Sequence, residues 1–573
     1  MDNNAGKIEG PQDAGRINKK RDMGRAEWSR SMPDKRARNE QEQQVKRRKL
    51  DNGEEIVAPI YATEFSKEDI EAEQRRPKKK VAVLIGYSGT GYKGMQLSTT
   101  EKTIEGELFT AFVAAGAISK ANAADPKKSS LVRCARTDKG VHAAGNVVSL
   151  KLIVEDEDIV QKINEKLSSQ IRIWAIQVAN KSFSSYQMCD SRIYEYLIPS
   201  HCFLPPHPST YLGIKLKELA EKEGDLEAHS ARQEEVATYW SEVDEKVIRP
   251  LVESFSEDVR KAVEKALHMG DEQESSGIDP TEAEQQATES ENTPAAETSS
   301  TEKPVEPLND KELAFKKEVY QAVKSVKAAI LKARRAYRIP PARLDRIQQA
   351  LDKYVGTWNF HNYTIQKGFK DPSAKRHIKT FNLNREPIII DGSEWLSLKV
   401  HGQSFMMHQI RKMVAMAAMV VRCGCDPERI VHSYGETRLA IPKAPGLGLL
   451  LERPVFDVYN KKAADLKKEP IDFSKYDKEM NEFKQREIYD RIFREEEQTH
   501  AFSSFFNHID HYAQEEFLYV TSGGISAAKP ITPPGERKDE NELAQPKRKS
   551  QREALAEVEQ ESEDERPRGE EEG

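Results

Sequence analysis

The sequence has few of the residues that build a large hydrophobic core. Only 37% of its 573 residues are hydrophobic and 7% are aromatic, whereas 32% are charged. The mean hydropathy of -0.74 is low for a chain that folds along its whole length. The folded part must therefore be smaller than the chain, and long solvated segments must accompany it.

Cysteine-based sites and membrane spans are also missing. The number of cysteines is odd, and none of them stands in a CxxC pair or a Cys/His cluster with the spacing of a zinc site. They are Cys134, Cys189, Cys202, Cys423 and Cys425. We expect free thiols, no metal and no organic cofactor. No run of 18 apolar residues occurs, and no apolar segment follows the first charges, so neither a membrane span nor a secretory signal is expected.

The charges are segregated along the chain, although the formal net charge is only -6. Residues 1–50 contain fourteen Lys and Arg against eight Asp and Glu, while residues 271–306 contain eleven acids, one Lys and no aromatic. Segments of this kind cannot bury enough apolar surface to offset the entropy lost on ordering. We therefore predict a disordered basic arm (1–77), a disordered acidic loop within an insertion, and a disordered acidic tail (535–573).

Two folded blocks remain, an N-terminal half at 78–214 and a C-terminal half at 310–460. Between them, 215–309 is predicted to hold charged helices and the acidic loop, and 461–534 a charged helical extension. The first half is predicted to contain strands at 81–85, 131–134, 146–153, 171–178 and 192–198, with helices at 103–119 and 157–168. The second half is predicted to contain a helix ending near 356, a hairpin of 387–391 with 396–400, and a helix at 404–423. Strict βαβ alternation is absent, which favours an α+β fold.

The sharpest chemical signal is the segment Cys-Ala-Arg-Thr-Asp-Lys-Gly-Val-His-Ala at 134–143, which lies between two predicted strands. An aspartate in such a turn commonly serves only to close the turn through its own side chain. Asp138 is therefore a candidate catalytic carboxylate that the segment alone does not separate from a structural residue.

Four further segments accompany it in order, and together they carry a family resemblance. They are GYSGTGYKGMQ at 86–96, SRIYEYLIP at 191–199, GQSFMMHQIRKMV at 402–414 and KAPGLGLLLERPVFD at 443–457. With these segments the sequence resembles the TruA family of tRNA pseudouridine synthases, across both folded halves. The resemblance implies two ferredoxin-like halves joined into one mixed, mainly antiparallel sheet with a basic central cleft.

The resemblance also implies roles for individual residues. Asp138 matches the essential aspartate of the family, and Arg136 an arginine thought to help extrude the target base. Tyr194 matches the tyrosine that packs against the uracil. Arg411 matches the basic residue that pairs with the aspartate, and Leu449 an apolar residue of the pocket. His142 and His408 are assigned no chemistry.

The reaction explains why these residue types are needed. Pseudouridine formation breaks the N1–C1′ bond, turns the uracil and joins C5 to C1′. A carboxylate can attack C1′ or take the 2′ proton on a glycal route, and the sequence leaves both open. In either case it must be ionised, and a guanidinium such as that of Arg411 lowers its pKa and fixes its direction.

Two basic segments suggest partners. The run Lys367, Lys370, Lys375, Arg376, His377 and Lys379 is either an ordinary exposed loop or a set of RNA phosphate contacts. Lys46-Arg47-Arg48-Lys49 is either a nonspecific RNA arm or, with the basic residues at 35–38, a signal for the nuclear import machinery. We expect the second use, and hence a nuclear protein.

These observations predict an isomerase that converts uridines of tRNA to pseudouridine, with small nuclear RNA and mRNA left open as further substrates. The alternative is a catalytically silent RNA-binding or RNA-chaperone protein. Such a protein has no use for a carboxylate that faces RNA phosphates, so Asp138 together with Tyr194 and Arg411 favours the enzyme.

Overall fold

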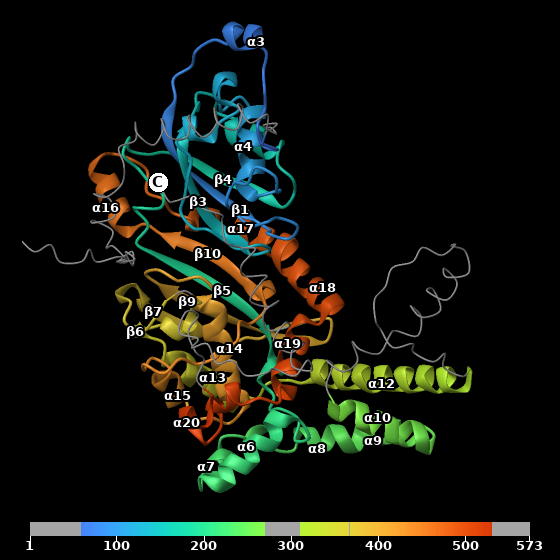
Figure 1. The fold of residues 1–573 in the computed structure, drawn as a ribbon. Coiled ribbons are helices and arrows are strands. Elements are labelled where there is room, and N and C mark those ends of the chain that lie inside the picture. The colour runs from blue at the N-terminus through green and yellow to red at the C-terminus, as the bar shows by residue number, and fades with distance from the viewer. Residues whose placement is uncertain (1–58, 270–309, 366, 530–573) are drawn as a thin grey trace, which may run out of the picture. The chain divides into compact units, whose positions relative to one another are not determined.

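The computed structural model describes residues 59–269, 310–365 and 367–529, and its centre is one ten-stranded sheet (Figure 1). The strands are β1 (Lys79–Tyr87), β2 (Val132–Arg133), β3 (His142–Leu152), β4 (Ile171–Val178), β5 (Ser191–Pro199), β6 (Gly356–Asn359), β7 (Lys375–Leu383), β8 (Ile388–Ile390), β9 (Ser393–Gly402) and β10 (Leu449–Val455). The main path runs β4-β1-β3-β10-β5-β9-β7-β6, with β2 beside β3 and β8 beside β9. Among the strand pairs of the described residues, only β3–β10 is parallel. The predicted α+β class is therefore confirmed, with a mixed and mainly antiparallel sheet.

Helices pack against this sheet and also form the two regions outside the predicted halves. They are α3 (Lys67–Ala72), α4 (Ile104–Ala114), α5 (Ile159–Asn164), α6 (Tyr211–Lys222), α7 (Leu226–Ala231), α8 (Tyr239–Val243), α9 (Arg249–Glu253), α10 (Glu257–Met269), α12 (Asp310–Ala336), α13 (Pro341–Asp352), α14 (Gln409–Arg422), α15 (Glu428–His432), α16 (Asp457–Asp465), α17 (Asp477–Phe483), α18 (Asp490–Thr499), α19 (Ala501–His511) and α20 (Gly524–Ala527). No helix in the described part of the chain is long and apolar enough to cross a membrane.

In the first half, β1 lies between β3 and β4, and α4 and α5 pack against each other. Thr103 caps α4 through a hydrogen bond that its side chain accepts from the Gly106 N–H, as capping residues do. The helix ends at Ala114, five residues before the predicted end, because Gly116 adopts a left-handed φ of 73°.

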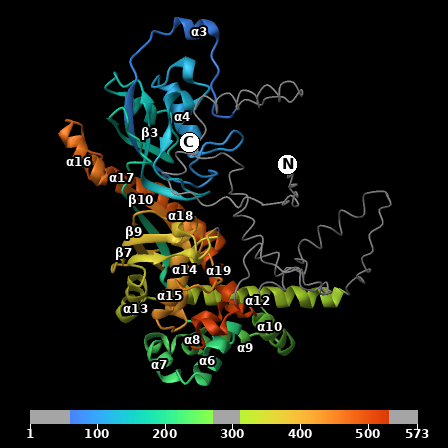
Figure 2. The same cartoon turned by 60° about the vertical axis from the view of Figure 1, so that its left-hand side comes forward.

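In the second half, α13 packs against β7 and α14, and Figure 2 shows β7 and β9 next to these helices. The hairpin between β8 and β9 turns at Asp391 and Gly392, whose φ values of 47° and 79° are typical of a tight hairpin turn. The helix predicted at 404–423 starts later, at Gln409, because His408 before it is left-handed.

The two halves share the sheet instead of forming separate ones. Strand β10, from the end of the second half, lies between β3 and β5 of the first half. Strand β5 in turn pairs with β9 of the second half along its whole length, from Arg192 with Gly402 to Pro199 with Trp395. The junction β3–β10–β5–β9 therefore brings together segments that are far apart in the sequence.

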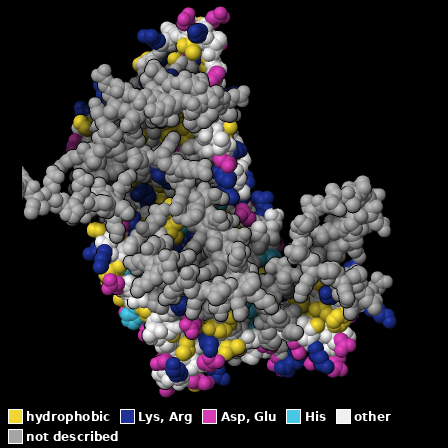
Figure 3. Space-filling view, viewed as in Figure 1, with side chains coloured by type: hydrophobic (Ala, Val, Ile, Leu, Met, Phe, Trp, Pro, Cys, Tyr) yellow, Lys and Arg dark blue, Asp and Glu magenta, His cyan; other side chains and the backbone are white. Residues whose placement is uncertain are grey.

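The insertion and the C-terminal extension fold as helices. Helices α10 and α12 enclose a small separate core that includes Val259, Val263 and Val326. Figure 3 shows acidic and basic side chains interspersed over the helices at the lower end of the view. The C-terminal extension, predicted from its charge, also buries Ile492, Phe502 and other apolar residues in the main core.

Two predicted disordered segments lie largely outside the described residues. These are the acidic loop 271–306 and the tail 535–573. The predicted basic arm also lies outside up to Ala58, but its last part is described and contains α3. The described part of the predicted arm therefore contains a helix, contrary to the prediction of disorder up to residue 77. The five cysteines are free thiols.

Candidate active site

The segment around Asp138 is a loop between β2 and β3 that hydrogen bonds hold on both sides. The Tyr87 hydroxyl lies 2.8 Å from the Thr137 Oγ1, and both groups are buried. Asn146 binds both polar backbone groups of Ala135, accepting from its N–H at 3.3 Å and donating to its carbonyl at 3.1 Å. The backbone that presents Asp138 is therefore fixed by side chains of β1 and β3.

The glycine-rich segment 86–96 packs directly against this loop. The Met95 N–H donates to the Thr137 carbonyl at 3.1 Å. A Cβ on Gly94, whose φ is 94°, would lie 2.8 Å from the same carbonyl oxygen, and one on Gly89 would lie 2.3 Å from the Val141 carbonyl oxygen. Glycine is needed at these two positions because two backbone segments touch there. This contact explains why the two motifs occur together.

Asp138 lies in a partly covered and positively charged environment. Its side chain is 34% exposed. Burial raises the pKa of its carboxyl group, and the positive charges of Arg411 and Lys443 oppose that effect by favouring the carboxylate. The two cations come from the start of α14 and from the loop before β10.

Arg411 is held by that same loop. Its Nε donates to the Ala444 carbonyl at 2.7 Å, and a Cβ on Gly446 would lie 3.4 Å from its Cζ. The Tyr196 hydroxyl donates to the next carbonyl, that of Pro445, at 2.5 Å. The loop therefore positions the guanidinium while it leads the chain into β10.

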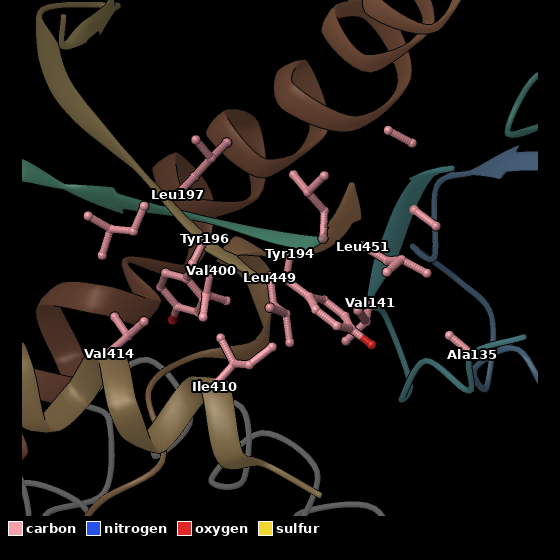
Figure 4. Packing of buried hydrophobic residues seen from close by; sticks show 14 of the residues in the cluster. Ala135, Val141, Tyr194, Tyr196, Leu197, Val400, Ile410, Val414, Leu449 and Leu451 are labelled. Carbon is pink, nitrogen blue, oxygen red and sulfur yellow. The ribbon is translucent and has the colours of Figure 1, made fainter. Parts of the chain in front are cut away.

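Tyr194 and Leu449 line the apolar side of the site. Tyr194 lies on β5 between Leu451 and Val400 of the neighbouring strands, and its ring packs edge-to-face on Phe405 at 5.3 Å. Figure 4 shows the ring next to Leu449 and Val141. Burial raises the pKa of the Tyr194 hydroxyl to about 12, so the tyrosine is neutral at physiological pH.

The structure therefore brings four of the five predicted site residues together, from one loop, one helix and two strands. Asp138 lies in the loop before β3, Arg411 at the start of α14, and Tyr194 and Leu449 at the β5–β10 junction. Arg136, the fifth, is an exposed residue of the same loop as Asp138. The described residues contain no group of three or more His, Cys, Asp or Glu side chains that could hold a metal ion.

Comparisons with known proteins show the family to which the chain belongs. The sequence model of a family described as tRNA pseudouridine synthase matches residues 350–457. The chain is 44% identical over 448 residues to tRNA pseudouridine synthase 1 of Eremothecium gossypii, covering 78% of this chain and 76% of that protein. It is 41% identical to the protein of the same name in Schizosaccharomyces pombe, covering 82% and 90%. The chain belongs to the TruA family of tRNA pseudouridine synthases. The chain is also 36% identical over 436 residues to tRNA pseudouridine(27/28) synthase of Saccharomyces cerevisiae, covering 75% of this chain and 99% of that protein.

Two residues that this TruA-family chain places beside Asp138 were missed from the sequence. Lys443 begins one of the family segments, but nothing in its spacing indicates that its charge acts on Asp138. His408 lies in another, and its Nδ1 is 3.8 Å from the Asp138 Oδ2. His142 makes a structural contact. Its buried Nδ1 accepts a hydrogen bond from the Gly89 N–H at 3.1 Å, so this ring supports the glycine-rich segment.

Proposed function

We propose that this protein converts uridines of tRNA to pseudouridine and that Asp138 is the essential carboxylate. The observation that carries the proposal is that the positive charges of Arg411 and Lys443 act on Asp138 and favour its ionised form. A carboxylate that only closed a turn would need no cations from two other segments. The buried ring of Tyr194 nearby supplies a surface on which a base can stack.

The reaction requires a charged and directed carboxylate. The N1–C1′ bond breaks, C5 joins C1′, a proton leaves C5 and N1 gains one. Asp138 acts either by attacking C1′ or by taking the 2′ proton, and both routes need the ionised form. Arg411 and Lys443 favour that form, and the loop bonds of Thr137 and Ala135 limit where the carboxylate can point.

The base must leave its stack before it can react, which costs a few kcal/mol. Stacking on an aromatic ring returns about 1–3 kcal/mol per base. In the proposal, Tyr194 and Leu449 hold the uracil, and Arg136 fills the space that the base leaves in the RNA. A neutral tyrosine suits this role because an anion would repel the RNA.

The proposal includes the two ferredoxin-like halves with a basic cleft between them. It is supported by the pair of packed helices in each half, α4 with α5 and α13 with α14. Lys379 on β7 lies against the start of the strand that carries Tyr194, since its Nζ donates to the Ser191 hydroxyl of β5 at 3.2 Å. We propose that the basic run from Lys367 to Lys379, which begins before β7 and continues along it, contacts RNA phosphates.

An assay of the purified full chain on several RNAs tests the proposed function. Unmodified tRNA, small nuclear RNA and mRNA fragments are incubated with the enzyme, and pseudouridine is mapped by its stable carbodiimide adduct. We expect product in tRNA at defined uridines. Product in the other two RNAs would extend the substrate range, which is the broader form of the proposal. RNA annealing without product in any RNA would favour the chaperone alternative.

We further propose that the protein acts in the nucleus. The support is the basic cluster Lys46–Lys49, which lies outside the described residues. Replacing these four residues with alanine should move a fluorescently tagged protein towards the cytoplasm. Unchanged nuclear fluorescence would favour an RNA-binding arm.

A further inference from the structure

A buried histidine lies beside the proposed catalytic carboxylate and has no part in the proposal so far. The His408 Nδ1 is 3.8 Å from the Asp138 Oδ2, and the imidazole side chain is completely covered. His408 immediately precedes α14, and Arg411 follows three residues later. The start of one helix therefore delivers both an imidazole and a guanidinium to the same aspartate.

The backbone at His408 is unusual for a residue with a side chain. Its φ of 60° and ψ of 1° are left-handed, a conformation that glycine adopts freely and that histidine adopts at a cost. Glycine or asparagine would fit the turn with less strain. A strained residue that persists next to reacting groups is a reason to look for a function.

Burial and the surrounding positive charges keep the His408 ring neutral. Burial, followed by the positive charges of Lys443, Arg411 and Lys412, lowers the pKa of His408 to about 3. The ring therefore faces Asp138 as a neutral imidazole with one N–H donor and one acceptor. It does not compete with Arg411 as a cation, and it can only direct the carboxylate through a hydrogen bond.

We propose that His408 is a positioning residue for Asp138, whose carboxylate accepts a hydrogen bond from the His408 Nδ1–H once uridine fills the site. The inference rests on the proposed role of Asp138. The distance of 3.8 Å between Nδ1 and Oδ2 exceeds the usual length of a hydrogen bond by less than about 1 Å. Contacts of this kind often tighten only when substrate is bound. The bond would hold one carboxylate oxygen so that the other faces the ribose.

Three substitutions separate this role from packing. His408→Asn keeps an N–H donor close to the position of Nδ1 and tolerates the left-handed backbone. His408→Leu has a similar size and no donor. His408→Gly also lacks the donor but removes the backbone strain, so it replaces the Leu variant if that protein does not fold. Asp138→Asn is measured in parallel, and melting temperatures are recorded for all proteins.

The measurement is the turnover of unmodified tRNA by the full chain as a function of pH. We expect kcat to fall about 10- to 100-fold in the Leu and Gly variants and less than about 5-fold in the Asn variant, with KM unchanged. Loss of the donor should raise the pKa of Asp138, so the acid limb of the kcat profile should move to higher pH in Leu and Gly and return in Asn. Arg411, Lys443 and Tyr194, which also face Asp138, are unchanged in every variant.

Equal losses in the Asn and Gly variants, or no loss in Gly, would overturn the inference, as would a loss without a shift of the acid limb. Full activity of Asp138→Asn is a different failure, because it would remove the proposed catalytic role itself. An inactive Asp138→Asn beside a fully active His408→Gly would overturn only the inference about His408.

Discussion

At the scale of single residues, the pKa of Asp138 depends on its own burial and on two cations from other segments of the chain. Burial disfavours its charged form, while Arg411 and Lys443 favour it. The balance matters because only the ionised carboxylate can attack or deprotonate the ribose. Activity should therefore decline as the pH falls through the pKa of Asp138, and that decline should depend on the two cations.

Removing Arg411 tests this balance. Arg411→Gln should raise the pKa of Asp138 and move the acid limb of the kcat/KM profile to higher pH, with kcat reduced about 100-fold at neutral pH. Arg411→Lys should return much of the pH shift but little of the rate, because an ammonium group lacks the planar fork that orients a carboxylate. The measurement is the pH profile of kcat/KM for the wild type and the two variants on the same tRNA. An unmoved acid limb in Arg411→Gln would show that the guanidinium does not act on Asp138.

The site residues that could be predicted from sequence motifs are those whose side-chain type the proposed reaction requires. Asp138, Tyr194 and Arg411 stand in ordered segments that a family resemblance can match. Lys443 and His408 could not be assigned in this way, because a lysine in a loop and a histidine before a helix are usually structural or solvated. Only their distance from Asp138, which depends on the tertiary fold, distinguishes them.

At the scale of elements, the C-terminal extension fixes the two strands that carry Tyr194 and Leu449. The Lys484 Nζ lies 3.0 Å from both the Glu195 Oε2 on β5 and the Glu452 Oε2 on β10. The Tyr489 hydroxyl also donates to Glu195, at 2.8 Å. Glu195 is the neighbour of Tyr194 in the sequence, so this ion cluster sets the position of the strand that bears the tyrosine.

Breaking this cluster should be costly. Lys484→Met leaves the buried Glu195 without its ammonium partner, and we expect a loss of about 3–5 kcal/mol in the free energy of unfolding. The double variant Lys484→Met with Glu195→Gln should be more stable than the sum of the single losses, since the fully buried carboxylate is then removed with its partner and only the partly exposed Glu452 loses a contact. Denaturant titrations of the three variants measure this coupling. Additive losses would show that the two residues act independently.

A contact between the helices α18 and α19 makes the free energy of unfolding depend on pH. Glu496 is buried at the end of α18 and accepts a hydrogen bond from the Phe502 N–H at 3.1 Å, at the start of α19. Burial raises the pKa of Glu496 to about 7 from 4.5, although backbone N–H groups favour its charged form. The folded state then holds a proton that the unfolded state releases above pH 4.5. This contribution to stability is lost as the pH rises from about 4.5 to about 7.

Glu496→Gln removes that loss, because glutamine stays neutral and still offers an oxygen to the helix start. We expect the variant to match the wild type near pH 4.5 and to be more stable at pH 8, by about 3 kcal/mol at most. Chemical denaturation at both pH values makes the comparison. An equal difference at the two pH values would mean that Glu496 does not titrate between them.

Most strands and four helices, α4, α5, α13 and α14, could be predicted from periodicity and capping, since these signals are local. The strands β6, β7 and β10 were not predicted. Two of the helix ends were predicted wrongly, because the apolar periodicity does not show where the backbone becomes left-handed. The first helix of the N-terminal half stops early at Gly116, and α14 starts late at His408, where the backbone turns left-handed. The apolar face of the C-terminal extension was missed because its many charges dominate the composition.

At the scale of the whole molecule, the order of strands could not be read from the sequence. Strand β10 is the last to appear in the chain, yet it lies between β3 and β5. This placement depends on contacts between distant segments. It also explains why the five motifs are spread over both halves, since the junction at β3, β10, β5 and β9 brings them into one site.

The acidic segment 271–306 lies outside the described residues and should be dispensable. Helices α10 and α12 on either side pack on each other, so a short Gly-Ser linker can replace the segment. Because loop length has a weak effect on stability, we expect a melting temperature within about 2 °C of the wild type and unchanged turnover of tRNA. A large loss of either would show that the segment binds RNA or packs on the fold.

The most direct test of the central claim is the turnover of Asp138→Asn. The substitution preserves size and removes only the negative charge that the reaction needs. Purified wild-type and variant proteins are given the same unmodified tRNA, with pseudouridine formation and RNA binding measured side by side. We expect no detectable product from the variant and a Kd for tRNA within a few-fold of the wild type. Product formation at a near wild-type rate would contradict the assignment of Asp138 as the catalytic carboxylate.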